Sequence, residues 1–181
     1  MVKLDIIETI EIPENVEVSL DGRIFKAKGE AGEVIKDLIS PIVLIDIEKE
    51  KITLTVKKAS KNEKRLLKTA KKHMINVMAG AKKEFEYKLK ICSGHFPMSV
   101  TKESNKLTIK NFLGEKVPRH ADLLEGAKVE INGSDITITS CNIETAGQTA
   151  ANIERSTRIV NRDRRRFQDG IYITVKAGAE I

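Results

Sequence analysis

Large aromatic side chains and long apolar segments are both scarce in this 181-residue sequence. It has no tryptophan, and aromatic residues make up 4% of the chain, so the apolar content rests mainly on aliphatic residues that suit small, simply packed layers. No apolar run reaches the roughly 18 to 20 residues that a membrane span needs. Lys3, Asp5 and Glu8 lie where a signal peptide would be continuously apolar. We therefore expect a soluble intracellular protein with no membrane partner.

Patterns for metal binding and catalysis are also lacking. Cys92 and Cys141 stand alone, and His73, His95 and His120 fall at no spacing typical of a zinc site. We expect reduced thiols and no disulfide. No nucleophile, base and orienting group occur together. The sequence therefore predicts that the protein is not an enzyme and holds no metal and no cofactor.

Charge is distributed unevenly along the chain. The formal net charge is +6, from 32 basic and 26 acidic residues. Residues 1–56 hold 7 basic and 12 acidic residues, a balance of −5, so the remainder holds 25 basic and 14 acidic residues, a balance of +11. One surface that binds a polyanion, with nucleic acid as the first candidate, explains this asymmetry. A generally lysine-rich soluble protein is the alternative that composition alone leaves open.

The chain also repeats itself. At an offset of 82 positions, the residues Lys28, Gly32 and Glu33 recur as Lys110, Gly114 and Glu115. At an offset of 84, the segments 45–47 and 52–55 recur as 129–131 and 136–139. Chance similarity would give no common offset, and a unit of about 80 residues has the size of a domain. We predict two domains, residues 1–81 and residues 82–181.

Each predicted domain has the same order of elements. In the first, alternating β-branched residues predict strands over 16–20, 23–28, 42–48 and 51–56. Ser60 and Glu63 form a capping box, after which an apolar stripe predicts a helix ending at Gly80. In the second, strands are expected over 99–101, 107–111, 128–132, 135–140 and 170–175, with a helix from Ile143 to Thr157. The fold class is α+β: two tandem copies of a small antiparallel sheet with a helix packed on one face.

Two basic runs are candidates for binding. The first lies on the predicted helix of the first domain, opposite the apolar stripe, where a solvated face is the ordinary interpretation and RNA contact the minority one. Its members are Lys57, Lys58, Lys61, Lys64, Arg65, Lys68, Lys71 and Lys72.

The second run is arginine-rich and follows the second helix. Guanidinium groups bind phosphate bidentately and repel one another when no anion is present, so this density predicts polyanion binding. A solvated loop with local pairing to Asp163 and Asp169 is the alternative. Phe167 and Tyr172 could stack on bases, although their apolar surroundings favour anchoring of the loop. The residues of the run are Arg155, Arg158, Arg162, Arg164, Arg165 and Arg166.

The glycine segments 29–33 and 111–116 lack the Gly-Lys-Ser/Thr ending of a phosphate-binding loop, so we interpret them as tight turns. Residues 132–134 match a glycosylation acceptor, but with no secretory signal they predict the hairpin turn before Asp135.

Four motifs in order then resemble one known family. They are Ile12-Pro-Glu-Asn-Val16, His95-Phe-Pro97, Asn111-Phe-Leu-Gly-Glu-Lys116 and Phe167-Gln-Asp-Gly-Ile-Tyr172. Together they resemble the large-subunit ribosomal protein family numbered six in bacteria and nine in eukaryotes, over nearly the whole chain. The form of residues 161–172 is similar to the archaeal and eukaryotic members and favours an archaeal source. Glu84 stands where the family often has glycine.

The resemblance implies a cytoplasmic component of the large ribosomal subunit. It implies binding to large-subunit rRNA near the sarcin/ricin loop, with neighbouring ribosomal proteins as partners and translation GTPases close by. The second domain would make the main RNA contacts while the first projects outward. The RNA-binding residues carried over are the six arginines of the second run together with Lys116 and Arg119. The alternatives are an RNA-processing enzyme with tandem domains and a protein adaptor.

Overall fold

The computed structural model describes residues 4–38, 42–48, 50–94 and 96–181. The chain divides into two compact units, Met1–Glu84 and Phe85–Ile181, called unit 1 and unit 2 below. His95, part of one motif above, lies outside the described residues. No helix in the described ranges is long and apolar enough to cross a membrane.

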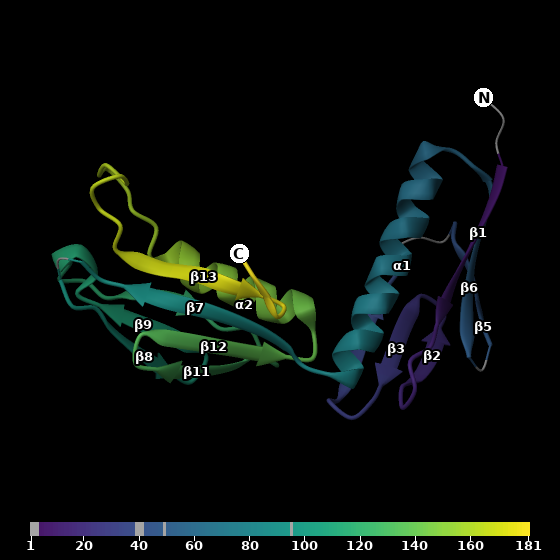
Figure 1. Ribbon diagram of the computed structural model, residues 1–181, viewed down its shortest axis with the longest axis horizontal. Coiled ribbons are helices and arrows are strands. Elements are labelled where there is room, and N and C mark those ends of the chain that lie inside the picture. The colour runs from purple at the N-terminus through teal and green to yellow at the C-terminus, as the bar shows by residue number, and fades with distance from the viewer. Residues whose placement is uncertain (1–3, 39–41, 49, 95) are drawn as a thin grey trace. The chain divides into compact units, whose positions relative to one another are not determined.

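Unit 1 consists of two antiparallel sheets and one helix (Figure 1). One sheet has the order β2-β3-β4 and the other β1-β6-β5. The helix α1 contacts β3 and β4 of the first sheet and β1 and β6 of the second, so the core lies beneath it. The elements are β1 (Leu4–Glu11), β2 (Glu17–Asp21), β3 (Ile24–Lys28), β4 (Glu33–Asp37), β5 (Leu44–Ile47), β6 (Lys51–Ala59) and α1 (Lys61–Lys82).

The start of α1 confirms the predicted capping box. The backbone N–H of Ser60 donates to Glu63 Oε2 at 2.8 Å, and the Ser60 hydroxyl accepts from the N–H of Asn62 at 3.3 Å. These bonds satisfy donors that the first turn of a helix leaves without partners. Leu67, Met74 and other members of the predicted stripe are buried. The helix ends two residues beyond Gly80, at Lys82.

The glycine segment of unit 1 is a turn that docks on the end of α1. The N–H of Ala31 donates to the carbonyl of Ala81 at 2.9 Å, and the N–H of Gly29 donates to Gly32 at 3.1 Å. A Cβ on Gly29 would lie 2.6 Å from the Ala81 oxygen. Only glycine permits this approach without a backbone shift. The turn therefore covers a carbonyl that the helix end leaves unsatisfied.

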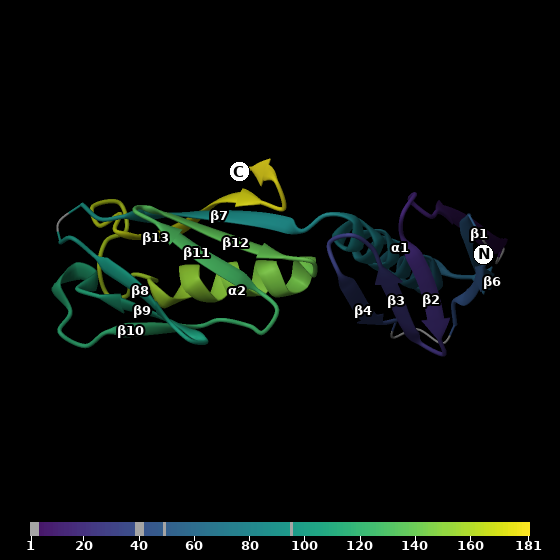
Figure 2. The ribbon, with the colours of Figure 1, turned by 90° about the horizontal axis from the view of Figure 1, so that it is seen from below.

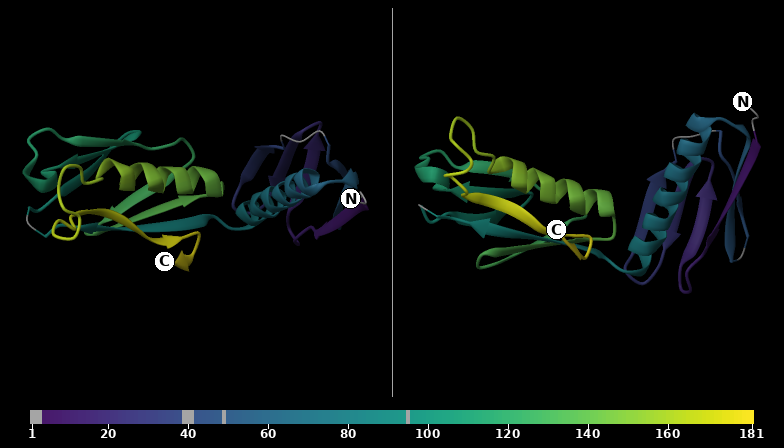
Figure 3. Two further views of the ribbon diagram at one scale, coloured as in Figure 1. Left: turned by 90° about the horizontal axis from the view of Figure 1, so that it is seen from above. Right: turned by 45° about the horizontal axis from the view of Figure 1, so that its top comes forward.

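Unit 2 repeats this plan and adds to it. Its sheets have the orders β10-β9-β8 and β11-β12-β7-β13-β14. In Figure 2 β13 lies beside β7, and in Figure 3 α2 runs along one face of the strands. The elements are β7 (Phe85–Cys92), β8 (Ser99–Glu103), β9 (Lys106–Lys110), the short 3₁₀ helix η1 (Phe112–Gly114), β10 (Arg119–Asp122), β11 (Lys128–Asn132), β12 (Asp135–Ser140), α2 (Ile143–Ser156), β13 (Gly170–Lys176) and β14 (Ala179–Glu180).

The helix of unit 2 packs closely, as its small residues predict. Ala146, Ala150 and Ile153 are fully buried, and α2 contacts β10 of one sheet and β7, β12 and β13 of the other. Asn142 caps its start, since the side-chain oxygen accepts from the N–H of Glu144 at 2.9 Å. The core continues into the sheets through Leu89 and other residues. The helix thus fixes the position at which the chain leaves it, just before the arginine-rich segment.

The two units share one topology. β8 begins 82 residues after β2, β9 begins 82 after β3, and α2 begins 82 after α1. Sheet β1-β6-β5 corresponds to β7-β12-β11, and β2-β3-β4 corresponds to β8-β9-β10. The α+β class is confirmed. The strands of each unit divide between two sheets, which adds a second sheet to the one that the sequence predicted for each domain.

Candidate nucleic-acid interface

The segment that follows α2, residues 157–169, is called the arginine loop, and its first residue is held inside the protein. Thr157 is 3% exposed. Its hydroxyl accepts from the N–H of Ile171 at 2.9 Å and lies 3.2 Å from the carbonyl of Glu154, to which it donates. Glu154 Oε1 accepts from the N–H of Ile173 at 3.1 Å. The end of α2 is therefore tied to β13.

The far end of the arginine loop is held as well. The buried Asp169 carboxylate accepts from the N–H of Gly94. Phe167 packs against the core of unit 2, as the sequence favours, and its N–H donates to the carbonyl of Asp163 at 3.0 Å. Residues 160–166 are all exposed. The loop thus has two fixed ends and an exposed middle that presents its cations to solvent.

Three arginines surround a recess of about 350 Å³ beside the end of α2: Arg155, Arg158 and Arg164. None of their side chains has an acidic partner within the described part of the chain. The one acid in the wall, Glu154, already accepts from a backbone N–H of β13. Three guanidinium groups against one carboxylate leave an excess of positive charge around the hollow, which favours an anion. The remaining lining residues are Thr157, Ile159 and Tyr172.

Tyr172 places an aromatic ring in the wall of this recess. It is 36% exposed, and burial raises the pKa of its hydroxyl, so this hydroxyl stays protonated at neutral pH. The ring face can stack on a base, while the hydroxyl donates to the carbonyl of Asp169 at 3.4 Å. The sequence had favoured a pure anchoring role for this residue. Its exposure and its place in the recess support the stacking alternative as well.

Two other arginines of the loop make contacts within the protein. Arg165 donates from Nη2 to Asp163 Oδ2 at 3.0 Å and from Nε to Oδ1 at 3.2 Å, which is the local pairing considered above. The hydrogen bonds from Arg165 lower the pKa of the Asp163 carboxyl. The guanidinium of Arg162 lies 5.0 Å from the centre of the Phe167 ring. Both charges remain exposed, so these contacts orient the side chains without covering them.

Arg119 makes more hydrogen bonds within the protein than the arginines of the loop do. Its Nε and Nη2 donate to the Glu115 carboxylate at 2.7 and 2.6 Å, and its Nη1 donates to the carbonyls of Ser156 and Arg158 at 2.9 and 3.0 Å. Its guanidinium also lies 4.3 Å from the Phe112 ring centre. Hydrogen bonding from Arg119 lowers the pKa of Glu115. The side chain therefore joins the turn after η1 to the end of α2, which is a positioning role.

The matched turn at residues 111–116 has an unusual backbone. Asn111, Leu113 and Gly114 have φ angles of 61°, 50° and 78°, in the left-handed region. Asn111 Nδ2 donates to the carbonyl of Pro97 at 3.1 Å, and Phe112 is buried. The next cation, Lys116, is exposed and has no acidic partner within the described ranges. The turn predicted here is confirmed, and it projects Lys116 toward solvent.

The structure thus brings the predicted arginines together at one end of unit 2. Arg155, Arg158 and Arg164 share a recess, and the clamp from Arg119 holds the turn bearing Lys116 to the same helix end. Arg166 is exposed. Sequence reasoning missed the roles of Thr157, Glu154 and Glu115. Their spacing carries no pattern, because each acts through a contact with a segment distant in the chain or across a turn.

Comparison with known proteins agrees with this description. The family model described as ribosomal protein L6 matches residues 96–170, which include η1, α2 and the arginine loop. A large ribosomal subunit protein uL6 from Methanococcus vannielii is 44% identical over 171 residues, covering 94% of each chain. One from Methanosarcina mazei is 44% identical, covering 98% of this chain and all of the relative. One from Nanoarchaeum equitans is 42% identical, covering 95% and 94%.

These relatives extend over both units and all come from archaea, as the form of residues 161–172 suggested. The sequence resemblance is confirmed, and the relatives are named as ribosomal proteins, which are structural components and not enzymes. With coverage and identity of this extent, the chain belongs to the uL6 family of large ribosomal subunit proteins.

Proposed function

We propose that this chain is a structural component of the large ribosomal subunit in the cytoplasm and that unit 2 binds large-subunit rRNA through its arginines. The observation that carries the proposal is the recess bordered by Arg155, Arg158 and Arg164, three cations without acidic partners in the described residues. Family membership supplies the ribosome as the setting. The role is passive binding.

The energetic basis is neutralisation of phosphate. Each arginine that contacts a phosphate releases condensed counterions, so affinity falls as salt is added. The planar guanidinium group also matches two phosphate oxygens at once. Tyr172 adds a ring on which an unstacked base can lie, a common feature of protein contacts with single-stranded or looped RNA. The recess therefore suits a phosphate together with its adjoining base.

Selectivity would come from the fixed geometry of the cations. Thr157 and Asp169 pin the two ends of the arginine loop, and Arg119 holds the η1 turn against the end of α2. Lys116 on that turn and Arg166 on the loop are then presented at a defined separation from the recess. A folded RNA can match such a rigid set of charges by its shape. An unrelated RNA would meet only part of it.

The finer location follows from the family resemblance. We propose that the RNA bound by unit 2 includes the region near the sarcin/ricin loop, where translation GTPases act, with other ribosomal proteins as neighbours. Unit 2 would be the main RNA-binding domain, since it contains the arginine loop. The relatives are named as ribosomal proteins, which favours this function over that of an RNA-processing enzyme.

The test is a filter-binding titration of the full chain at several salt concentrations. The RNAs are the 3′ part of large-subunit rRNA and an unrelated structured RNA of equal length. The variant R155Q/R158Q/R164Q removes the three recess cations. We expect wild-type protein to prefer the rRNA. We expect the variant to lose about two orders of magnitude in affinity at moderate salt, with a salt slope smaller by about 2 to 3.

A control of equal charge change removes three exposed lysines of unit 2 that do not line the recess, two of which pair with Glu86 and Asp122: K88Q/K106Q/K176Q. We expect it to retain most of the affinity and all of the preference for rRNA. Equal binding of the two RNAs by wild-type protein would leave only a generic basic protein. Equal losses in the two triple variants would remove the recess from the proposal. Salt-resistant binding to another protein, without RNA selectivity, would favour an adaptor.

A further inference from the structure

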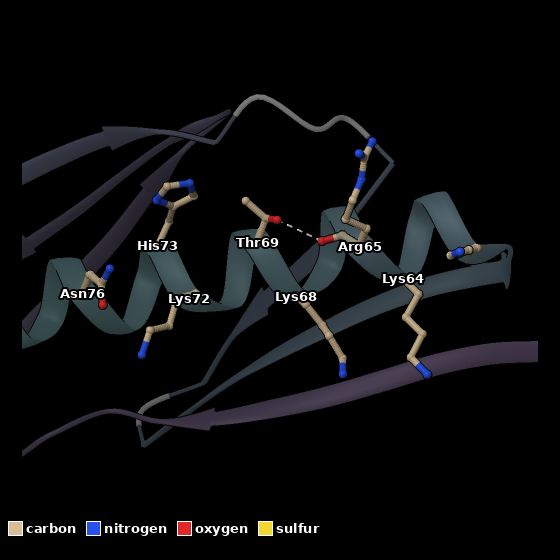
Figure 4. Close-up of a pocket in the computed structure, with 8 residues that line it drawn as sticks. Lys64, Arg65, Lys68, Thr69, Lys72, His73 and Asn76 are labelled. Carbon is tan, nitrogen blue, oxygen red and sulfur yellow. Dashed lines mark hydrogen bonds between the residues drawn. The ribbon is translucent and has the colours of Figure 1, made fainter. Parts of the chain in front are cut away.

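The helix of unit 1 carries a second concentration of cations, which we call the α1 face: Lys61, Lys64, Arg65, Lys68 and Lys72. All five side chains are exposed. Four of them recur at the three- and four-residue spacing that places side chains on one side of a helix. Together with Thr69, His73 and Asn76 they line a shallow open hollow along the helix (Figure 4).

Among the described residues, no acidic side chain forms an ion pair with any of these five cations. None of them has an ion-pair or hydrogen-bond partner for its side chain in the portion of the chain that the structure describes. The one acidic residue of α1, Glu63, is engaged in the capping box. Lys71 differs, because it pairs with Glu8 at 2.7 Å. Like charges one turn apart repel, so the α1 face is a feature that an anion would relieve.

The arrangement of the cations is linear. In Figure 4 Lys64, Lys68 and Lys72 point to one side of the helix, while Arg65 and His73 point to the other. Residues four apart are separated by about 6 Å along a helix axis. The three lysines therefore form a straight row of regularly spaced positive charges. A nucleic-acid backbone offers a matching row of regularly spaced negative charges.

We propose that the α1 face binds the phosphate backbone of RNA, as a second contact separate from the arginine recess. The eight residues that line the hollow include no large aliphatic side chain and no Phe, Tyr or Trp, so the hollow lacks the apolar anchor on which protein interfaces depend. Lysine ammonium groups bind phosphate as point charges without reading bases. The contact is therefore independent of sequence. The proposal rests on the proposed function only for the identity of the RNA as rRNA.

The rest of unit 1 explains why only this side would approach RNA. Phe25 and Ala27 of β3 and Ile52 of β6 are fully buried, and both strands contact α1. The residues that alternate with these three therefore lie on the face away from the core. Residues 1–59, up to the end of β6, hold 9 basic and 12 acidic residues, an excess of three acidic charges. A polyanion is thus repelled by the strand part of the unit and attracted by the helix. The polarity orients unit 1 on its ligand.

A matched pair of variants tests the proposal in the full chain. K64Q/K68Q/K72Q removes the row, and glutamine retains the helix propensity of lysine. K26Q/K28Q/K51Q removes three lysines at strand positions that alternate with the core residues Phe25, Ala27 and Ile52. The probe is the 3′ part of large-subunit rRNA. We expect the helix variant to bind about tenfold more weakly near 100 mM salt, with a slope reduced by 2 to 3, and the strand variant to bind nearly as wild type.

Circular dichroism checks that both variants keep their helix. Equal affinities of the two variants would overturn the α1 assignment. If R155Q/R158Q/R164Q still lost binding in that case, the proposed function of unit 2 would stand and only this inference would fail. If the helix variant lost binding while the recess variant did not, the α1 face would be the main RNA contact and the recess proposal would fail.

A second measurement needs no variant. Lysine acetylation of the full chain, read by mass spectrometry, is compared with and without the rRNA. We expect protection of Lys64, Lys68 and Lys72 and unchanged reaction of Lys28 and Lys51. Equal reactivity of the helix lysines in both states would overturn the proposal. Protection by polyglutamate as strong as by rRNA at equal charge would assign the face to an acidic protein instead.

Discussion

In each unit a turn contacts the C-terminal end of the helix, but the two units make this contact with different groups. In unit 1 the turn at 29–33 contacts the end of α1 through backbone alone, from the N–H of Ala31 to the carbonyl of Ala81. In unit 2 the turn at 111–116 reaches the end of α2 through the side chain of Arg119. A backbone contact requires close approach. An arginine spans a larger distance and leaves room for the chain to continue into the arginine loop.

The second difference lies at a sheet edge. In the described part of unit 1, β1 is the last strand of its sheet, while in unit 2 the corresponding strand β7 is covered by β13. The chain reaches β13 only after the arginine loop. The loop and β13 are therefore one addition to a repeated framework, and Thr157 joins the two parts of that addition. New binding chemistry is located in the addition, and the repeated elements hold it in place.

The largest loss of stability is expected from a substitution that disrupts the backbone contact between the turn and α1 in unit 1. G29A places a Cβ against the Ala81 carbonyl, so we expect a loss of about 3 kcal/mol in the stability of unit 1. Urea titration followed by hydrogen exchange measures this separately for peptides of each unit. The control is G22A: Gly22 has a φ of 61° and nothing lies within 4 Å of the added Cβ, so only backbone strain is tested and about 1 kcal/mol is expected. Equal losses would show that the close approach does not matter.

The next largest loss is expected from removing the Arg119 side chain that joins the turn to α2 in unit 2. R119A removes two bonds to Glu115 and two to the carbonyls at the end of α2, and we expect a loss of about 2 kcal/mol confined to unit 2. R119K keeps the charge but not the planar fork, and should recover less than half of the loss. The same urea titrations measure both variants. A variant R119A as stable as wild type would contradict the role of the clamp.

A smaller loss of stability is expected from removing the Thr157 hydroxyl, which joins the end of α2 to β13. T157V keeps the shape of the side chain but leaves the N–H of Ile171 without its acceptor, at an expected cost of about 1 to 2 kcal/mol. T157S retains the hydroxyl and serves as the control. Hydrogen exchange at Ile171 should rise in the valine variant and remain slow in the serine variant. Unchanged exchange in both would mean that the bond does not hold β13.

The smallest effect concerns pH. Hydrogen bonding to Arg119 lowers the pKa of Glu115 below its ordinary value of 4.5. A carboxyl whose pKa is lower in the folded state contributes stability above its unfolded pKa and loses it as pH falls through the folded value. Acid below about pH 4.5 should therefore weaken the clamp of unit 2, while the backbone contact of unit 1 has no such group. Stability measured from pH 6 to pH 3 in wild type and E115Q checks this, since E115Q should lose less.

The repeat and the order of elements were predictable because they leave periodic patterns in the sequence. Lys28 and Lys110 end the corresponding strands β3 and β9, and Gly32 and Gly114 lie in the connections that follow. The third match is inexact, since Glu33 begins β4 while Glu115 lies in the turn before β10. The strands β1, β4, β7, β10 and β14 lie outside the ranges predicted from residue patterns. β10 has four residues, Arg119–Asp122, and forms because β9 offers a pairing edge, not because its own residues favour a strand.

The candidate site likewise has features that the sequence predicts and features that it does not. The density of arginine after α2 was visible in the sequence, and so was the pairing of Arg165 with Asp163, because both depend on residues close together in the chain. The grouping of Arg155, Arg158 and Arg164 around a recess depends on how the chain turns after α2. The engagement of Arg119 depends on contacts 37 and 39 residues away. No local pattern encodes such contacts.

The central claim, that the arginine recess contacts large-subunit rRNA, is tested most directly by chemical modification. The full chain is treated with a reagent specific for guanidinium groups, alone and in complex with the 3′ part of the rRNA, and modified arginines are identified by mass spectrometry. We predict that Arg155, Arg158 and Arg164 become protected in the complex while Arg23, an exposed arginine of unit 1, reacts as before. Equal modification of the three recess arginines in the free and bound protein would contradict the account.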